Sequence, residues 1–92
     1  MSEQVITQGR RLPDGPMKLG DFHRGDYKKV LYDDGTMHWY ALLPSCDLAL
    51  LDGHSVTEHE DGTITVSPSI LMTMGSTQLW HGYLERGAWR EV

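Results

Sequence analysis

One cysteine and five histidines are the side chains of this 92-residue chain best suited to bind a transition metal. Thiolates and imidazoles are the usual ligands of structural zinc, which four of them hold in tetrahedral geometry. Such ligands normally occur in closely spaced pairs, and the spacing here matches no such motif. Two interpretations therefore stay open: a metal site built from some of these residues, or histidines that each make one hydrogen bond. The residues concerned are Cys46, His23, His38, His54, His59 and His81.

Hydroxyl and thiol groups near a histidine are the second set that could do chemistry. Ser67 or Ser69 beside His59 would supply the residue types of nucleophilic catalysis, with Asp61 to orient the base. Cys46 beside a histidine would do the same. Neither serine lies in a G-x-S-x-G turn, which exposes a nucleophile between a strand and a helix. The Ser-Pro-Ser sequence is instead typical of a turn that ends a strand. We therefore expect a protein that is not an enzyme.

Strands must position these side chains, because apolar residues recur at every second position far more than every 3.6 residues. Asp-Gly dipeptides separate the alternating segments, and Asp-Gly favours two-residue hairpin turns in which both residues have positive φ. In the first hairpin, KKVLYD-DG-TMHWYALL, a turn at 34–35 pairs Tyr32 with Met37 and Val30 with Trp39.

A second hairpin, SVTEHE-DG-TITVS, has its Asp-Gly turn at 61–62. This turn pairs His59 with Ile64 and Thr57 with Val66 on one face. The residues that alternate with these four are threonines and glutamates, so the opposite face is expected to meet solvent.

A third hairpin, HGYLE-RG-AWREV, closes the chain with an Arg-Gly turn at 86–87. The same two-residue geometry places Leu84 opposite Trp89. It also places Tyr83 opposite Arg90, at a spacing that favours a cation–π contact.

The three hairpins predict an all-β or β-dominated fold, a small antiparallel sheet or sandwich with at most one short helix. The length fits one domain, 1–92, with its hairpin core in 30–92. Residues 1–29 are expected to be irregular, apart from an edge strand at 4–7. The one helical segment expected covers 69–73 and ends at Gly75.

Composition restricts the compartment and the partners. A single cysteine excludes an internal disulfide, and no apolar run reaches the roughly 18 residues that span a bilayer. These features predict a cytoplasmic protein with no membrane partner. Residues 1–30 carry six basic and four acidic side chains, whereas residues 31–92 carry two basic and nine acidic ones. Because phosphate binding needs clustered Lys and Arg, nucleic acid is not an expected partner.

Two segments of the C-terminal half, HSVTEHEDGTITVSPSI (54–70) and WHGYLERGAW (80–89), carry a resemblance. They resemble a family of small, uncharacterised proteins encoded mainly by bacteriophages and prophages. Its members share T-E-H-x-D-G-T-x-T-x-S-P-S-I followed by H-x-[WY]-[LI]-x-x-G-x-W. The match covers roughly 43–92 and leaves residues 1–29 outside. The resemblance implies a phage- or prophage-encoded protein in the cytoplasm of a bacterial host.

The resemblance also implies a metal site that is only partly retained. Many relatives look like zinc-ribbon variants, with a Cys-rich knuckle before T-E-H and Cys-x-x-His before the aromatic ending. Here the first knuckle corresponds to Cys46 alone and the second to His81 alone, with Gln78 in place of the second cysteine. Cys46 and His81 alone would hold zinc weakly, so one or two of His54 and His59 would have to join them, since a structural site takes four ligands.

Large apolar side chains are numerous for so short a chain, with three Trp, four Tyr and five Met. Trp, Tyr and Met are enriched in protein interfaces, although they would equally fill a two-layer core. Both interpretations stay open for Trp80, Tyr83, Trp89, Met72 and Met74.

These observations together predict a non-enzymatic phage or prophage accessory protein that binds a host or phage protein. Such a protein would inhibit or modulate its partner, or associate as a homodimer. A small zinc-binding domain and a virion-associated structural protein are the two alternatives.

Overall fold

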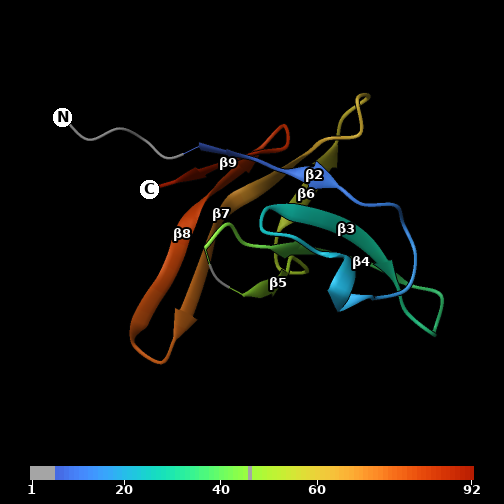
Figure 1. The fold of residues 1–92 in the computed structure, drawn as a ribbon, viewed down its shortest axis with the longest axis horizontal. Coiled ribbons are helices and arrows are strands. Elements are labelled where there is room, and N and C mark those ends of the chain that lie inside the picture. Colours follow the sequence, from blue (N-terminus) through green and yellow to red (C-terminus); the bar gives the residue numbers. More distant parts are fainter. Residues whose placement is uncertain (1–5, 46) are drawn as a thin grey trace.

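Two β-sheets face each other across one hydrophobic core in the computed structural model, which describes residues 6–45 and 47–92 (Figure 1). The five-stranded sheet is antiparallel throughout and has the order β1 (Ile6–Gln8), β9 (Ala88–Glu91), β8 (Thr77–Glu85), β7 (Ile64–Met74), β6 (Ser55–Glu58). The four-stranded sheet has the order β2 (Arg10–Arg11), β3 (Asp26–Leu31), β4 (Met37–Leu42), β5 (Leu48–Leu50). Only β2 and β3 are parallel neighbours within it. A 3-10 turn, η1 (Leu19–Asp21), precedes β3.

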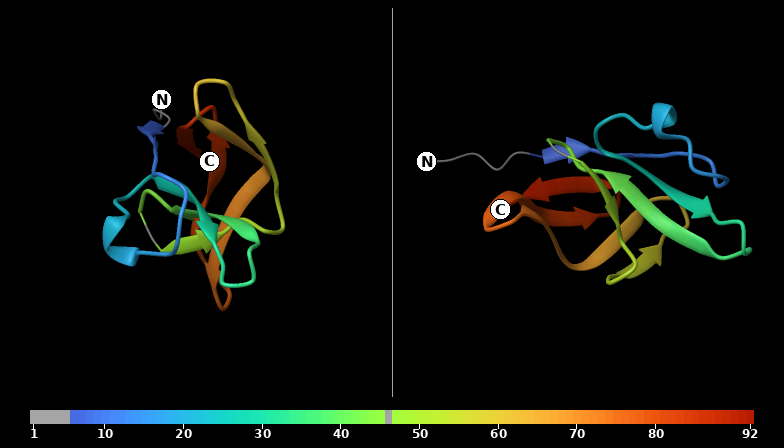
Figure 2. Two further views of the ribbon diagram at one scale, coloured as in Figure 1. Left: turned by 90° about the vertical axis from the view of Figure 1, so that its right-hand side faces the viewer. Right: turned by 90° about the horizontal axis from the view of Figure 1, so that it is seen from below.

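The all-β prediction is confirmed. Figure 2 shows the layers, with β3, β4 and β5 on one side and β7, β8 and β9 on the other. Within the described residues, no helix is long and apolar enough to cross a membrane.

The helix expected at 69–73 is wrong, because this segment belongs to the long strand β7. Pro68 does not end that strand as expected. It lies where the register between β7 and β8 shifts, between Val66 and Ile70, after a cis Ser67–Pro68 peptide. Proline is tolerated at a β-bulge because its missing N–H removes no regular ladder hydrogen bond there. The strand therefore continues past the proline.

The third hairpin forms as predicted. Leu84 pairs with Trp89 and Tyr83 with Arg90, whose guanidinium carbon lies 4.6 Å from the centre of the tyrosine ring. Arg86 and Gly87 both have positive φ, 46° and 78°, as a two-residue type I′ turn requires.

The register predicted for the first hairpin is wrong by one residue. Val30 pairs with His38 and Leu31 with Met37. Of the Asp-Gly dipeptide, only Gly35 has positive φ, 86°, so the loop is a longer one with a glycine bulge. In this loop Asp34 accepts hydrogen bonds from the main-chain N–H of Thr36 at 2.9 Å and from the Thr36 hydroxyl at 2.6 Å.

The second hairpin departs from its predicted register in the same way. Glu58, not His59, pairs with Ile64, and Val66 pairs with Val56. The loop again has one positive φ, 88° at Gly62, and Asp61 accepts from the following threonine. The expected burial of the apolar face is nevertheless found, since Ile64 and Val66 are both buried.

The N-terminal region is more regular than predicted. The edge strand is confirmed as β1, although residues 4 and 5 of the predicted range lie outside the described residues. Strand β2 and most of β3 also precede residue 30. Between β1 and β2 the chain leaves one sheet for the other at Gly9, whose N–H donates to the Gly87 carbonyl at 2.7 Å. A Cβ at Gly9 would lie 2.7 Å from that oxygen and 2.8 Å from the Gly25 oxygen, so only glycine fits.

The core joins both sheets. Trp89 from β9 reaches across to donate its indole N–H to the Gly25 carbonyl at 2.8 Å, and it meets Trp80 edge-on with ring centroids 5.5 Å apart. The largest of the other fully buried side chains are Tyr27, Leu43, Leu51, Ile64, Ile70 and Leu84.

Replacing Gly9 with alanine should lower the free energy of unfolding by about 2 kcal/mol or more, because two main-chain oxygens cannot move away independently. In thermal denaturation this corresponds to a Tm lower by about 10 °C. Gly53→Ala is the matched control, since its Cβ would meet no atom within 4 Å. Equal melting temperatures for the two variants would contradict the close crossing.

Candidate functional site

Two of the predicted metal ligands, His54 and His81, converge on Ser69. His54 precedes β6 and its Nε2 lies 3.2 Å from the Ser69 carbonyl oxygen. His81 lies on β8, and its Nε2 is 2.9 Å from the Ser69 hydroxyl oxygen. Because β7 runs between β6 and β8, it brings the serine between two histidines that are far apart in sequence.

The other two predicted ligands do not join this pair. His59 Nε2 lies 2.7 Å from the hydroxyl of Thr65 on its own hairpin, and Cys46 lies outside the described residues. In the described part of the chain, no three His, Cys, Asp or Glu side chains form a group suited to a metal ion. The arrangement of the described residues does not fit a tetrahedral zinc site, because two imidazoles are present and Ser69 engages both.

Ser69 and His81 are at the distance of a nucleophile and its base. Within the described residues no carboxylate hydrogen-bonds to His81, so nothing there orients the imidazole as a triad would. His59 bonds to Thr65 rather than to Ser67 or Ser69, the serines considered from the sequence. The described contacts of these serines and histidines join neighbouring strands of the five-stranded sheet.

His38 makes side-chain contacts on both ring nitrogens that the sequence did not predict. His38 Nδ1 lies 2.9 Å from the Asp52 carboxylate, and its Nε2 lies 2.8 Å from the Thr36 hydroxyl. The Thr36 hydroxyl also lies 2.6 Å from Asp34, and together with the main-chain N–H of Thr36 it lowers the pKa of Asp34 below its usual value. One hydroxyl hydrogen serves one acceptor, and the shorter contact assigns it to Asp34. His38 is therefore not placed to remove a proton from Thr36.

Thr36 and His38 are two residues apart in the segment predicted to be a strand, which could have suggested that their side chains meet, although β4 itself begins at Met37. Asp52 comes from a different loop, after β5, and nothing in the sequence relates it to His38. Because the predicted register of this hairpin was wrong by one residue, the pairing of His38 with Val30 was not foreseen either.

Trp39 is covered by two cations that share one carboxylate. The Arg11 guanidinium carbon and the Lys29 ammonium lie 5.0 and 5.4 Å from the indole centre. Glu58 accepts from Lys29 at 2.7 Å and from Arg11 at 3.1 Å, which joins β6 of one sheet to β2 and β3 of the other. Because this ring is covered and its cations are paired, it is poorly suited to stack on nucleic-acid bases.

The residues predicted to bind a partner divide between core and surface. Trp80 and Trp89 are each 1% exposed, so the structure places both indoles in the core and not at the surface. Tyr83 is half-buried beneath Arg90, and Met72 packs partly against the core. Met74 is 66% exposed, and the neighbouring Leu71, which the sequence did not single out, is 55% exposed. Leu71 was missed because a helix was expected there, so the alternation of a strand was not applied to it.

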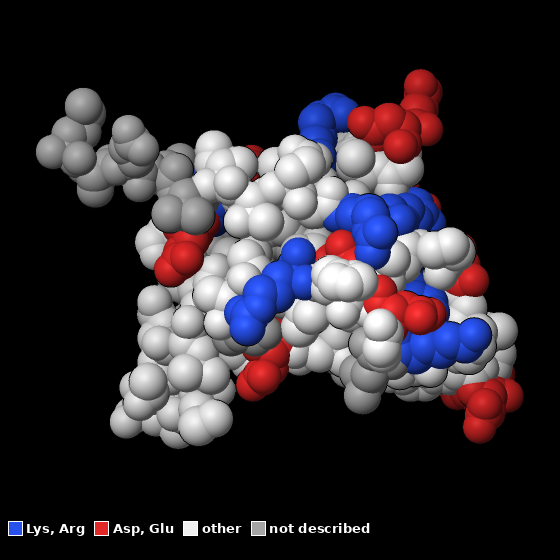
Figure 3. Space-filling view, in the orientation of Figure 1, with Lys and Arg blue, Asp and Glu red and all other residues white. Residues whose placement is uncertain are grey.

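The ends of β7 and β8 form a two-stranded extension, residues 71–79, called here the apolar ribbon. Pairing with β6 stops at Ser67 and pairing with β9 stops at Gly82, so no strand among the described residues lies beside either edge of the ribbon. No Asp, Glu, Lys or Arg occurs from 68 to 84. The ribbon projects at the lower left of Figure 1, and the corresponding surface in Figure 3 carries no charged side chain.

No protein-family model, curated protein or solved structure matches this chain.

Protein purified without a histidine tag should contain no stoichiometric zinc, because the described residues supply two imidazoles and not four ligands. Elemental analysis and melting curves with and without a chelator measure this. Removal of a structural zinc would lower the Tm markedly. Stoichiometric zinc, together with a chelator-dependent loss of Tm, would contradict this expectation.

The hydrogen bonds from Lys29 and Arg11 lower the pKa of Glu58, although partial burial opposes them. Glu58 therefore contributes stability above its unfolded pKa, and this contribution is lost as the pH falls through the lower folded pKa. Since the side chain is 42% exposed, Glu58→Gln should cost less than about 1 kcal/mol at pH 7, and the difference from wild type should vanish in acid. Urea titrations across pH measure it. Glu60→Gln is the matched control, since this exposed glutamate forms no ion pair within the described residues, and it should be as stable as wild type at pH 7.

Proposed function

We propose that this chain is a non-enzymatic phage or prophage accessory protein that acts by binding a host or phage protein through the apolar ribbon. The phage assignment, and with it a place in the bacterial cytoplasm, rests on the sequence resemblance of 54–70 and 80–89. The binding role rests on the geometry of the ribbon.

The single observation that carries the binding role is a protruding strand pair whose two edges have no neighbouring strand in the described part of the chain. Unpaired main-chain groups along an edge can pair with a strand of another chain. Natural proteins protect such edges with Lys, Pro or inward-pointing charges, and residues 71–79 contain none of these. A two-stranded ribbon is also only marginally stable alone in water, so it gains from a partner.

The chemistry of the ribbon indicates the chemistry of its partner. Leu71 and Met74 offer exposed apolar side chains, and methionine adapts its shape to different surfaces. A partner should therefore present an uncharged apolar surface next to an unpaired strand edge. A second copy of the chain satisfies the same requirement, because an uncharged surface meets itself without repulsion in a two-fold dimer.

The non-enzymatic character is supported by the histidine contacts. Ser69 and His81 lack an orienting carboxylate among the described residues, and the Thr36 hydrogen is taken by Asp34. The apolar ribbon therefore supports a binding function better than the Ser69–His81 and Thr36–His38 contacts support catalysis.

Placing lysines at the ribbon, Leu71→Lys with Met74→Lys, should weaken partner binding at least tenfold, which is about 1.4 kcal/mol. The reason is that an ammonium would have to be desolvated in an apolar contact. Pull-downs from the bacterial host would find a partner, and sedimentation would detect a homodimer.

The matched control is Leu50→Lys, at an equally apolar position on β5 that is 45% exposed and lies on the other sheet. This variant should bind like wild type. Circular dichroism should show that all three proteins are folded alike. A monomeric wild type that captures no partner would remove the proposal, and so would equal binding by the ribbon variant.

A further inference from the structure

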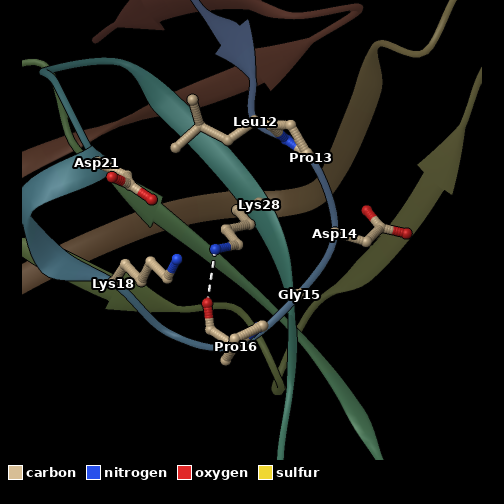
Figure 4. Close-up of a pocket in the computed structure, with 8 residues that line it drawn as sticks. All are labelled: Leu12, Pro13, Asp14, Gly15, Pro16, Lys18, Asp21 and Lys28. Carbon is tan, nitrogen blue, oxygen red and sulfur yellow. Dashed lines mark hydrogen bonds between the residues drawn. The ribbon is translucent and has the colours of Figure 1, made fainter.

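A pocket of about 360 Å³ lies between the loop after β2, η1 and strand β3 (Figure 4). Its lining residues come from the loop after β2, from η1 and the residue before it, and from β3 of the four-stranded sheet, and none of them belongs to the apolar ribbon. Its volume is at the lower end of the range for small-molecule sites. The lining residues are Leu12, Pro13, Asp14, Gly15, Pro16, Lys18, Asp21 and Lys28.

Lys28 gives this pocket a buried cation. The residue is only 5% exposed, and its Nζ donates to the Pro16 carbonyl oxygen at 2.6 Å. An ammonium has three N–H donors, and this carbonyl is its one hydrogen-bond acceptor among the described residues. Within that same part of the chain, no carboxylate oxygen lies within 4.0 Å of Lys28 Nζ. A buried charge without a counter-ion is unfavourable, so the pocket is suited to an anion.

Lys18 adds a second cation from the opposite wall. Figure 4 shows its ammonium directed toward that of Lys28, whereas the carboxylate of Asp14 points away from both. Asp14 is already engaged by Arg11, 3.2 Å away. Two ammonium groups therefore face the pocket with one remaining lining carboxylate, that of Asp21, which leaves an excess of positive charge.

We propose that this pocket binds a small oxyanion, a free carboxylate or phosphate, on the ammonium groups of Lys28 and Lys18. Charge-assisted hydrogen bonds to an oxyanion would use the donors of Lys28 that the Pro16 carbonyl does not. The two oxygens of a carboxylate, or those of a phosphate, can bridge the two lysines. This site is independent of the proposed partner binding, because no ribbon residue lines it.

Titration of the 15N-labelled protein with inorganic phosphate and with acetate, each at constant ionic strength, tests the site. We expect saturable chemical-shift changes in the millimolar range at the amides of Gly15, Lys18 and Asp21 with at least one of the two anions. The relative affinities of phosphate and acetate then distinguish the two sources of the oxyanion. Chloride at the same ionic strength should leave these amides unchanged.

Two lysine variants complete the test. Lys18→Gln, at an exposed residue, should weaken anion binding about tenfold because one charge-assisted contact is lost. Lys28→Gln should abolish binding if it folds, and the Lys18 variant decides the matter if it does not. Lys29→Gln is the matched control, since it removes the same charge from the neighbouring residue, which pairs with Glu58 outside the pocket. Unchanged amides with both anions, or equal weakening by the Lys18 and Lys29 variants, would overturn the proposal.

Discussion

The fold depends on a close contact between main chains beneath Trp89. The indole of Trp89 holds the Gly25 carbonyl, and Gly9 passes beside both Gly25 and Gly87 with no room for a side chain. This contact ties the start of β3 in one sheet to β9 in the other, at the point where the N-terminal segment changes sheets. Gly82 extends the same constraint, because a Cβ there would lie 2.6 Å from the Trp80 ring. Two tryptophans that the composition could have assigned to an interface are therefore committed to holding the layers together.

Local sequence predicted the strands better than it predicted their registers. The Arg-Gly turn was read correctly because both residues do adopt positive φ. Asp34-Gly35 and Asp61-Gly62 resemble it in sequence, but each aspartate accepts from the next threonine, and this favours a longer bulged loop. The expected helix at 69–73 failed because a short apolar segment does not distinguish a strand from a helix. Pairing with β8 decides the matter, and no local pattern records that pairing.

The candidate sites likewise divide into contacts that local sequence could predict and contacts that depend on long-range pairing. That histidines would make single polar contacts was one of the two interpretations open from the sequence, and His54, His59 and His81 do make them. Their convergence on Ser69 depends on the order of β6, β7 and β8, which spacing alone does not give. The burial of Lys28 could not be predicted from the sequence for a similar reason. Residues 1–29 looked irregular, yet they supply a loop that closes over β3. Strand order therefore places the exposed apolar surface, and the loop after β2 covers the buried cation.

The pairing of the first strand with the last has a consequence for how the chain acquires its structure. Thr7 pairs with Trp89, so closing the five-stranded sheet brings together residues from opposite ends of the sequence. Contacts of such separation slow folding, because the entropy of a long loop is lost before the contact stabilises anything. During synthesis, β1 leaves the ribosome long before its partner strand exists. Until β9 has been synthesised, neither the pairing of β1 nor the contact at Gly9 can form.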